Sequence, residues 1–144
     1  MTSLKLENQL CHRLYVASNA IIRAYRPILD KMDITYPQYI VLLALWETNA
    51  VDIGTLKNKT KIDGGALTLI LQKMQKKRLI ELIPDKRDRR SKIVSLTERG
   101  AALKQEAQHI PKKLACMLPN IESDHVDAMK DMLDTLITGF SHNI

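Results

Sequence analysis

The stretch from Asp52 to Leu96 constrains the fold more than any other, because two helix patterns are followed there by two strand patterns. Residues 53–59 predict a short helix and residues 63–78 predict a longer one. In the longer helix, apolar residues recur every three or four positions and define one stripe for burial. These residues are Leu67, Ile70, Leu71 and Met74. Asp63 lies where its carboxylate can accept the unpaired amide hydrogens at the start of that helix.

A charged turn between two strand-like runs follows the second helix. The runs are residues 80–83 and 93–96, and the turn at residues 85–90 holds four cations and two anions. Two helices followed by such a hairpin form a winged helix-turn-helix, which usually binds duplex DNA. The alternative is a solvated hairpin tip that is polar only for solubility. We therefore expect a mainly α fold with a small β-hairpin wing.

Composition and charge narrow the choice of partner. The formal net charge is +6 and the sequence pI is about 9.4, which favours an anionic partner. The basic residues cluster between Lys57 and Arg99, as expected for nucleic-acid binding. No apolar run approaches the roughly 20 residues of a membrane span, and residues 1–7 do not resemble a signal peptide. We therefore expect a cytoplasmic protein with no membrane partner.

Further helix patterns flank the winged region, and the 144 residues predict a single domain. Residues 6 to about 31 predict one long helix with apolar residues on two faces. Thr35, Thr97 and Ser123 are expected to cap three later helices. Apolar surface on two faces is more than one small domain covers easily, which favours a homodimer. An intramolecular helical bundle is the alternative.

These patterns divide the chain into a DNA-binding lobe and a dimerisation layer. The winged helix-turn-helix lobe is expected at residues 36–96. The N- and C-terminal helices, at residues 1–35 and 97–144, are expected to form the dimerisation layer.

In a winged helix, the second helix enters the major groove of DNA and the wing reaches the adjacent minor groove. The side chains expected to read bases are Thr68, Leu69, Gln72, Lys73 and Lys76. Glutamine can pair with adenine, and threonine can contact the thymine methyl group. The lysines in and just after the short helix at residues 53–59 are expected to bind phosphates. They are Lys57, Lys59 and Lys61. Arg87 and Arg90 are expected to enter a narrow, A·T-rich minor groove.

The wing motif Asp85-x-Arg87-Asp88-x-Arg90, followed by Leu96-Thr97-x-x-Gly100, resembles the wing signature of the MarR family of bacterial transcription regulators. The resemblance implies a homodimer on a pseudo-palindromic operator and, for this chain, the role of a repressor. It also implies that Arg90 inserts into the groove while the Asp88 carboxylate holds its guanidinium in place. The alternative is that these two residues form only a surface ion pair.

Within that family, the N-terminal half resembles the organic hydroperoxide regulators of the two-cysteine branch. The matching segments are LENQLC at residues 6–11, AYRPILD at residues 24–30 and TYPQY at residues 35–39. The resemblance implies that Cys11 is the peroxide-reactive thiol and that Tyr25 and Tyr36 are its hydrogen-bond partners. It further implies that Cys116 of the partner subunit resolves the oxidised thiol by closing a disulfide between subunits.

The chemistry of Cys11 agrees with that implication. Peroxide attack needs a thiolate, which the positive end of a helix dipole favours, and Cys11 lies in the first turn or two of the first helix. Tyr25 lies 14 residues further along, or roughly 21 Å in a straight helix, so it would have to act on Cys11 across a dimer interface. Oxidation gives a sulfenic acid that condenses with a second thiol, for which Cys116 is the candidate. Either cysteine could instead be a small buried hydrophobic residue.

Three other functions remain open from the sequence. A MarR-type regulator released by a small aromatic ligand would be indifferent to Cys11→Ser. A thiol peroxidase that uses Cys11 and Cys116 would leave the basic winged region without a role, and a structural nucleoid protein would bind random DNA as tightly as an operator. The leading prediction is a redox-sensing repressor that is not an enzyme and needs no cofactor. No metal site is expected, because the histidines and cysteines lack metal-ligand spacing.

Overall fold

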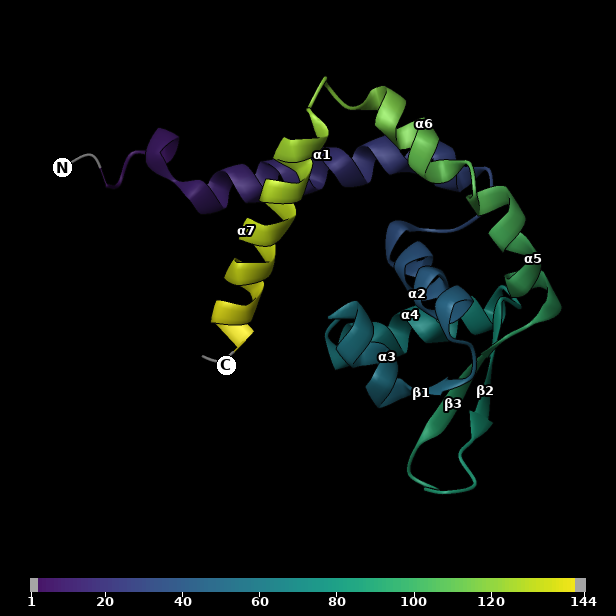
Figure 1. Ribbon diagram of the computed structural model, residues 1–144. Helices are drawn as coiled ribbons and strands as arrows, with labels where there is room; N and C mark the ends of the chain where they lie inside the picture. The colour runs from purple at the N-terminus through teal and green to yellow at the C-terminus, as the bar shows by residue number, and fades with distance from the viewer. Residues whose placement is uncertain (1–2, 142–144) are drawn as a thin grey trace.

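The computed structural model describes residues 3–141, so that residues 1–2 and 142–144 of the expected dimerisation segments lie outside it. It comprises η1 (Leu6–Asn8), α1 (Leu10–Asp30), α2 (Tyr36–Glu47), β1 (Val51–Asp52), α3 (Ile53–Thr60), α4 (Gly64–Lys76), β2 (Ile80–Pro84), β3 (Lys92–Leu96), α5 (Glu98–Ala107), α6 (Ile110–Met117) and α7 (Ser123–Ser141). The hairpin of β2 and β3 projects from the end of the winged lobe that lies opposite α1 (Figure 1). The expected mainly α fold with a small β-hairpin wing is confirmed.

The sheet contains a third strand that the sequence pattern did not predict. β1 pairs antiparallel with β3 through Val51 and Val94, so that the strand order is β1-β3-β2. A strand of two residues is too short to show an alternating pattern. Asp52 ends this strand and also caps α3, because its carboxylate accepts a hydrogen bond of 2.7 Å from the Thr55 amide. That bond holds the pKa of Asp52 below its ordinary value.

The core of the winged lobe forms around α4. The predicted stripe of this helix is confirmed, since Leu67, Leu71 and Met74 are buried and Ile70 is half-buried. Fully buried side chains from the neighbouring elements complete this core, and they are Leu42, Leu45, Leu56, Leu79, Ile80 and Val94. Burial of this stripe orients α4, because the opposite side of the helix must then face solvent.

Two of the four expected helix caps are present in the structure. The Thr35 hydroxyl accepts a hydrogen bond from the Gln38 amide, and the Gln38 side chain accepts one from the Thr35 amide, which makes a capping box. The Thr97 hydroxyl caps α5 by accepting from the Gly100 amide. Asp63 occupies the N-cap position of α4, but its side chain makes no capping bond to that described helix. Ser123 is the first residue of α7 rather than its cap.

The first helix begins later than expected. Residues 6–8 form a 3₁₀ turn, and α1 starts at Leu10 and continues through Pro27 to Asp30. Its C-terminal end is buried at Ile28 and Leu29, whereas most of its N-terminal half lies outside the core. The helix expected after the wing is divided into α5 and α6.

Large apolar side chains are exposed at both ends of the single chain. On and near α1 they are Leu4, Leu6, Leu10, Tyr15, Val16 and Ile21. From α6 to α7 they are Met117, Leu118, Ile121, Val126, Met129, Met132, Ile137 and Phe140. These are the segments that the sequence assigned to dimerisation, and their role in a dimer stays a prediction.

Gly100 offers a test of how closely α5 approaches the end of α4. A Cβ atom at this position would overlap the carbonyl group of Leu79, which already accepts a hydrogen bond from the Thr97 amide. We expect Gly100→Ala to lower the free energy of unfolding by at least about 2 kcal/mol, measured by urea denaturation. Gly139→Ala is the control, because a Cβ there meets no atom within 4 Å, and it should be neutral or mildly stabilising. Equal midpoints for the two variants would contradict the close approach.

Candidate nucleic-acid interface and sensor site

The residues expected to read bases lie on the exposed side of α4. Thr68, Leu69, Gln72, Lys73 and Lys76 are all exposed. Leu69 is 60% exposed although it is a large apolar residue, and it lies between polar neighbours that could contact a DNA groove. The Thr68 hydroxyl donates to the Gly64 carbonyl at 3.0 Å, so its rotation is restricted. The result is a mixed polar and apolar surface of the kind that base edges and thymine methyl groups require.

A cleft joins α4 to the wing. It has a volume of about 490 Å³, and its lining includes Thr68 and Gln72 from α4 together with Asp88 and Arg90 from the wing. The structure therefore brings these four predicted residues together. Leu69, Lys73, Lys76 and Arg87 lie outside the lining of this cleft, on exposed positions.

The acidic residues of the wing bind its backbone. The Asp85 carboxylate accepts a hydrogen bond from the Arg87 amide at 2.9 Å, and Asp88 accepts one from the Arg90 amide at 3.0 Å. Each is a turn in which a short acidic side chain replaces a backbone acceptor. The resemblance had implied that Asp88 holds the guanidinium of Arg90, but the contact in the structure is with its backbone amide. Both arginine side chains are exposed.

Phosphate-binding lysines are expected at the end of α3, and the structure places them on its surface. Lys57 and Lys59 lie in the last turn of α3, and Lys61 follows it in a left-handed conformation. All three are exposed. They extend the positive surface beyond α4, as a protein that follows a DNA backbone requires.

The predicted sensor residues fall into two separate groups within one chain. Cys11 is exposed in the first turn of α1, and Cys116 is exposed in α6. Tyr25 and Tyr36 are in contact, with ring centroids 4.7 Å apart. Tyr39 completes the aromatic cluster, with its ring centroid 5.9 Å from that of Tyr25. The continuous α1 keeps Cys11 and Tyr25 apart in the single chain.

Partial burial opposes ionisation of the Tyr25 phenol. Desolvation is the main cause that raises the pKa of Tyr25 to about 12, and the neighbouring Tyr36 and Tyr39 contribute further. Burial also raises the pKa of Tyr39. A phenol that is neutral at physiological pH keeps its hydrogen and can donate it to an anion.

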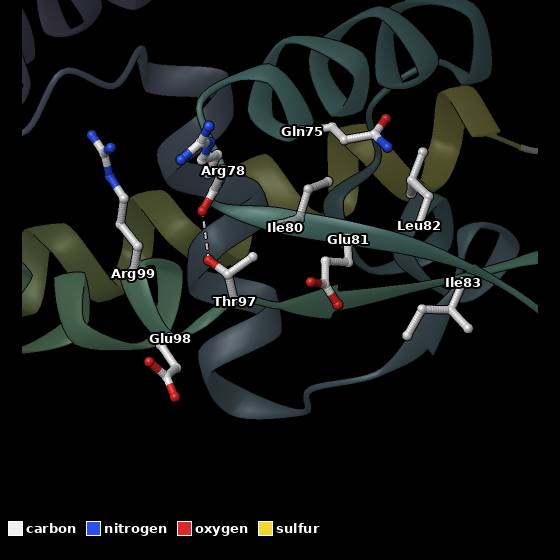
Figure 2. A pocket seen from close by; sticks show the side chains of 9 residues that line it. All are labelled: Gln75, Arg78, Ile80, Glu81, Leu82, Ile83, Thr97, Glu98 and Arg99. Atoms are coloured by element: carbon white, nitrogen blue, oxygen red, sulfur yellow. Dashed lines mark hydrogen bonds between the residues drawn. The ribbon is translucent and has the colours of Figure 1, made fainter.

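Sequence reasoning missed a second cleft, on the outer side of β2. Arg78, Glu81, Glu98 and Arg99 line a cleft of about 820 Å³, and Figure 2 shows the two guanidinium groups pointing away from the two carboxylates. The Thr97 hydroxyl there donates to the Arg78 carbonyl at 2.6 Å. Two arginines and two glutamates give this cleft no excess of charge, so it does not extend the basic surface.

Two features are absent from the described residues 3–141. Within this range, no group of three or more histidine, cysteine or acidic side chains is arranged to hold a metal ion. No helix of the same range is long and apolar enough to cross a membrane.

Comparisons with known proteins connect these features to one group of proteins. Residues 23–107 match the family described as "Transcriptional regulator SarA/Rot". The chain is 40% identical to the organic hydroperoxide resistance transcriptional regulator of Bacillus subtilis (strain 168) over 134 residues. This alignment covers 93% of this chain and 90% of that protein.

Solved structures of AbfR, a Staphylococcus epidermidis protein, are also similar to this chain. Reduced AbfR bound to DNA has a TM-score of 0.81 at 26% identity, over 99% of this chain and 96% of that chain. Disulfide-formed AbfR has a TM-score of 0.61 at 26% identity, over 95% of this chain and 90% of that chain. This chain is therefore more similar to the reduced, DNA-bound form of AbfR than to its disulfide form.

The ionisation of Tyr25 can be measured directly. We expect the difference in tyrosinate absorbance near 295 nm between the wild type and Tyr25→Phe to titrate with a midpoint near pH 12, because burial opposes the charged form. The raised pKa stabilises the fold below pH 10, and this contribution is lost as the pH rises from about 10 to 12. Tyr15→Phe, at an exposed position, is the control. A Tyr25 midpoint near 10 would contradict the desolvation of its phenol.

Proposed function

We propose that this chain, which belongs to the SarA/Rot family of MarR-like winged-helix transcriptional regulators, is a repressor that releases its operator when an organic hydroperoxide oxidises Cys11. Its family and relatives are DNA-binding regulators and not enzymes. The observation that carries the redox proposal is the exposure of Cys11 in the first turn of α1. The 40% identity to a hydroperoxide resistance regulator supports it.

The proposed reaction starts with the thiolate of Cys11. The sulfur attacks one oxygen of the hydroperoxide, the O–O bond breaks, and an alkoxide leaves that takes up a proton to become an alcohol. Cys11 is thereby oxidised by two electrons to a sulfenic acid. The thiol of Cys116 of the partner subunit then displaces water from that sulfenic acid and forms a disulfide. The exposure of both cysteines in the single chain leaves them accessible for this step.

The tyrosines are proposed to complete the site across a dimer interface. Tyr25 and Tyr36 lie at the C-terminal end of α1 and at the start of α2, far from Cys11 of the same chain. An antiparallel arrangement of two α1 helices would bring these phenols of one subunit to Cys11 of the other. Their hydroxyls would donate to the sulfur anion, because a phenol is protonated at physiological pH.

A homodimer is supported by the apolar side chains that the single chain leaves exposed on α1, α6 and α7. Such a dimer would present two copies of α4 to a pseudo-palindromic site in duplex DNA. Arg87 and Arg90 would enter the flanking minor groove, and an A·T-rich sequence would favour them there. We place this activity in the bacterial cytoplasm, where thiols are normally kept reduced.

The proposed switch follows from the geometry of a disulfide. Its two Cα atoms must come within about 7 Å, so if the reduced dimer holds Cys11 and Cys116 further apart, closing the bond would move α1 relative to α6 of the partner subunit. The winged lobe is attached to α1 through the turn before α2, so its recognition helices would change their spacing. The closer similarity to reduced, DNA-bound AbfR supports the present conformation as the form that binds DNA.

One observation favours a second candidate function. A mostly apolar cleft of about 310 Å³ lies between α2 and α5, and its lining includes Tyr39, Leu43, Trp46 and Lys104. A small aromatic acid could place its ring against the apolar side chains and its carboxylate near the lysine. The alternative is therefore a MarR-type regulator that such a ligand releases from DNA.

The redox proposal is tested by DNA binding before and after oxidation. We expect the reduced wild type to bind A·T-rich palindromic DNA and to lose at least tenfold in affinity, about 1.4 kcal/mol, after stoichiometric organic hydroperoxide. A thiol reductant should restore binding. Cys11→Ser should be insensitive, and Cys116→Ser should lack the disulfide-linked dimer on a non-reducing gel. If the wild type ignores peroxide but is released by an aromatic acid, the second candidate function is the correct one.

The DNA contacts are tested by their dependence on sequence and salt. We expect Arg90→Ala to cost about 1–3 kcal/mol on an A·T-rich operator and to reduce the preference for it. Lys59→Ala should weaken binding to all sequences alike and lower the salt slope by about one. Lys112→Ala, which removes one exposed cation from α6, is the control and should change neither quantity. An unchanged operator preference in Arg90→Ala would count against minor-groove insertion.

A further inference from the structure

Lys77 connects the end of the recognition helix α4 to the turn between α1 and α2. Its ammonium donates to the backbone carbonyl of Asp33 at 2.8 Å and to the side-chain oxygen of Gln38 at 3.1 Å. It also lies 3.8 Å from the Asp33 carboxylate. The lysine side chain is only 28% exposed, and Gln38 is 2% exposed. These contacts join positions 44 and 39 residues apart in the sequence.

Both helix ends that Lys77 joins are closed by backbone hydrogen bonds. At the end of α1, the Ile34 amide donates to the backbone carbonyl of Leu29, and the Asp33 amide donates to the backbone carbonyl of Asp30. Asp33 lies in the left-handed region at a φ of 54°. This pattern is a Schellman motif, in which a left-handed residue ends the helix.

The same pattern closes α4. The Leu79 amide donates to Met74 and the Arg78 amide donates to Gln75, with Arg78 at a φ of 60°. Leu79 and Met74 are both buried, so this end cannot shift without disturbing the core. Lys77 therefore links two well-defined ends rather than two loose loops.

Gln38 extends the connection toward the aromatic cluster. Its side-chain oxygen accepts hydrogen bonds from both Lys77 and the Thr35 amide, so the lysine binds the capping box that starts α2. Tyr36 is the first residue of α2, and its ring packs against Tyr25 of α1. A short series of contacts thus runs from the aromatic cluster to the recognition helix.

We propose that Lys77 is a positioning residue through which a movement of α1 and α2 sets the placement of α4 on DNA. This inference rests on the proposed function, because it gives the route by which oxidation of Cys11 lowers DNA affinity. A lysine suits the role, since the C-terminal end of α1 favours a cation and the ammonium offers three donors. Its partial burial limits competition from water for those bonds.

The test compares three variants of the full chain. Lys77→Met keeps the length of the side chain but removes its donors, Lys77→Arg keeps the cation and donors, and Asp33→Asn removes only the carboxylate. For each variant, DNA affinity is measured in the reduced protein and after organic hydroperoxide, and the ratio of the two is compared. Loss of one positive charge weakens DNA binding equally in the reduced and the oxidised protein, so its effect cancels in this ratio.

We expect the oxidation-driven loss of affinity to shrink at least fivefold in Lys77→Met and to stay within twofold of wild type in Lys77→Arg. Asp33→Asn should also stay within twofold, because that carboxylate is 76% exposed and the backbone carbonyl remains as an acceptor. The rate of Cys11 oxidation should be the same in all variants. A full wild-type ratio in Lys77→Met would overturn the proposed route.

Hydrogen–deuterium exchange separates failure of this inference from failure of the proposed function. We expect amides of residues 31–38 to exchange faster in reduced Lys77→Met but not in Lys77→Arg, which needs no peroxide response. If the DNA affinity of the wild type does not respond to peroxide, both the proposed redox function and the proposed route from Cys11 to α4 fail. Faster amide exchange in Lys77→Met would still support the connection of α4 to the turn between α1 and α2 through Lys77. Unchanged exchange in Lys77→Met would overturn the link itself.

Discussion

The burial of one face of α4 is the constraint on which the rest of the winged lobe depends. Leu67, Leu71 and Met74 pack into the core, so the opposite face of the helix must lie in solvent. The Gly100 backbone then fits against the carbonyl of Leu79, close to the end of α4, and this places α5 beside the hairpin. A single stripe of apolar side chains thereby orients both the surface that can read DNA and the connection to the C-terminal helices.

Local patterns predicted the parts of this structure that depend on neighbours in the sequence. The α4 stripe and the Thr35 and Thr97 caps involve residues within four or fewer positions of one another, so the sequence carried them directly. β1 was missed because its two residues are a strand only through pairing with distant β3. The contact of Lys77 with Gln38 was missed for the same reason, since 39 positions separate the two residues and their composition shows no pattern.

The wing shows how local acidic residues can support a basic surface. Asp85 and Asp88 use their carboxylates on backbone amides, which orders the hairpin tip. A carboxylate satisfied by the backbone competes less for the adjacent guanidinium groups, which are exposed. The sequence motif had suggested a pairing of side chains, because spacing alone does not distinguish an aspartate that binds an amide from one that binds an arginine. The observed arrangement leaves both guanidinium groups available to DNA, with Arg90 lining the cleft beside α4.

The two ends of α1 lie in different environments and require different side chains. Its C-terminal end must pack into the winged lobe at Ile28 and Leu29, whereas its N-terminal end carries Cys11 in an exposed first turn. A reactive thiol buried in an apolar core would be inert, so exposure in the single chain suits a sensor that a second subunit completes. In the proposed switch, the chemistry would take place at the end of α1 that is remote from the winged lobe, and affinity for DNA would respond through a movement of α1 as one body. The hydrogen-bonded closure of its end at Asp33 would suit such a movement, because a frayed end would absorb it before it reached the recognition helix.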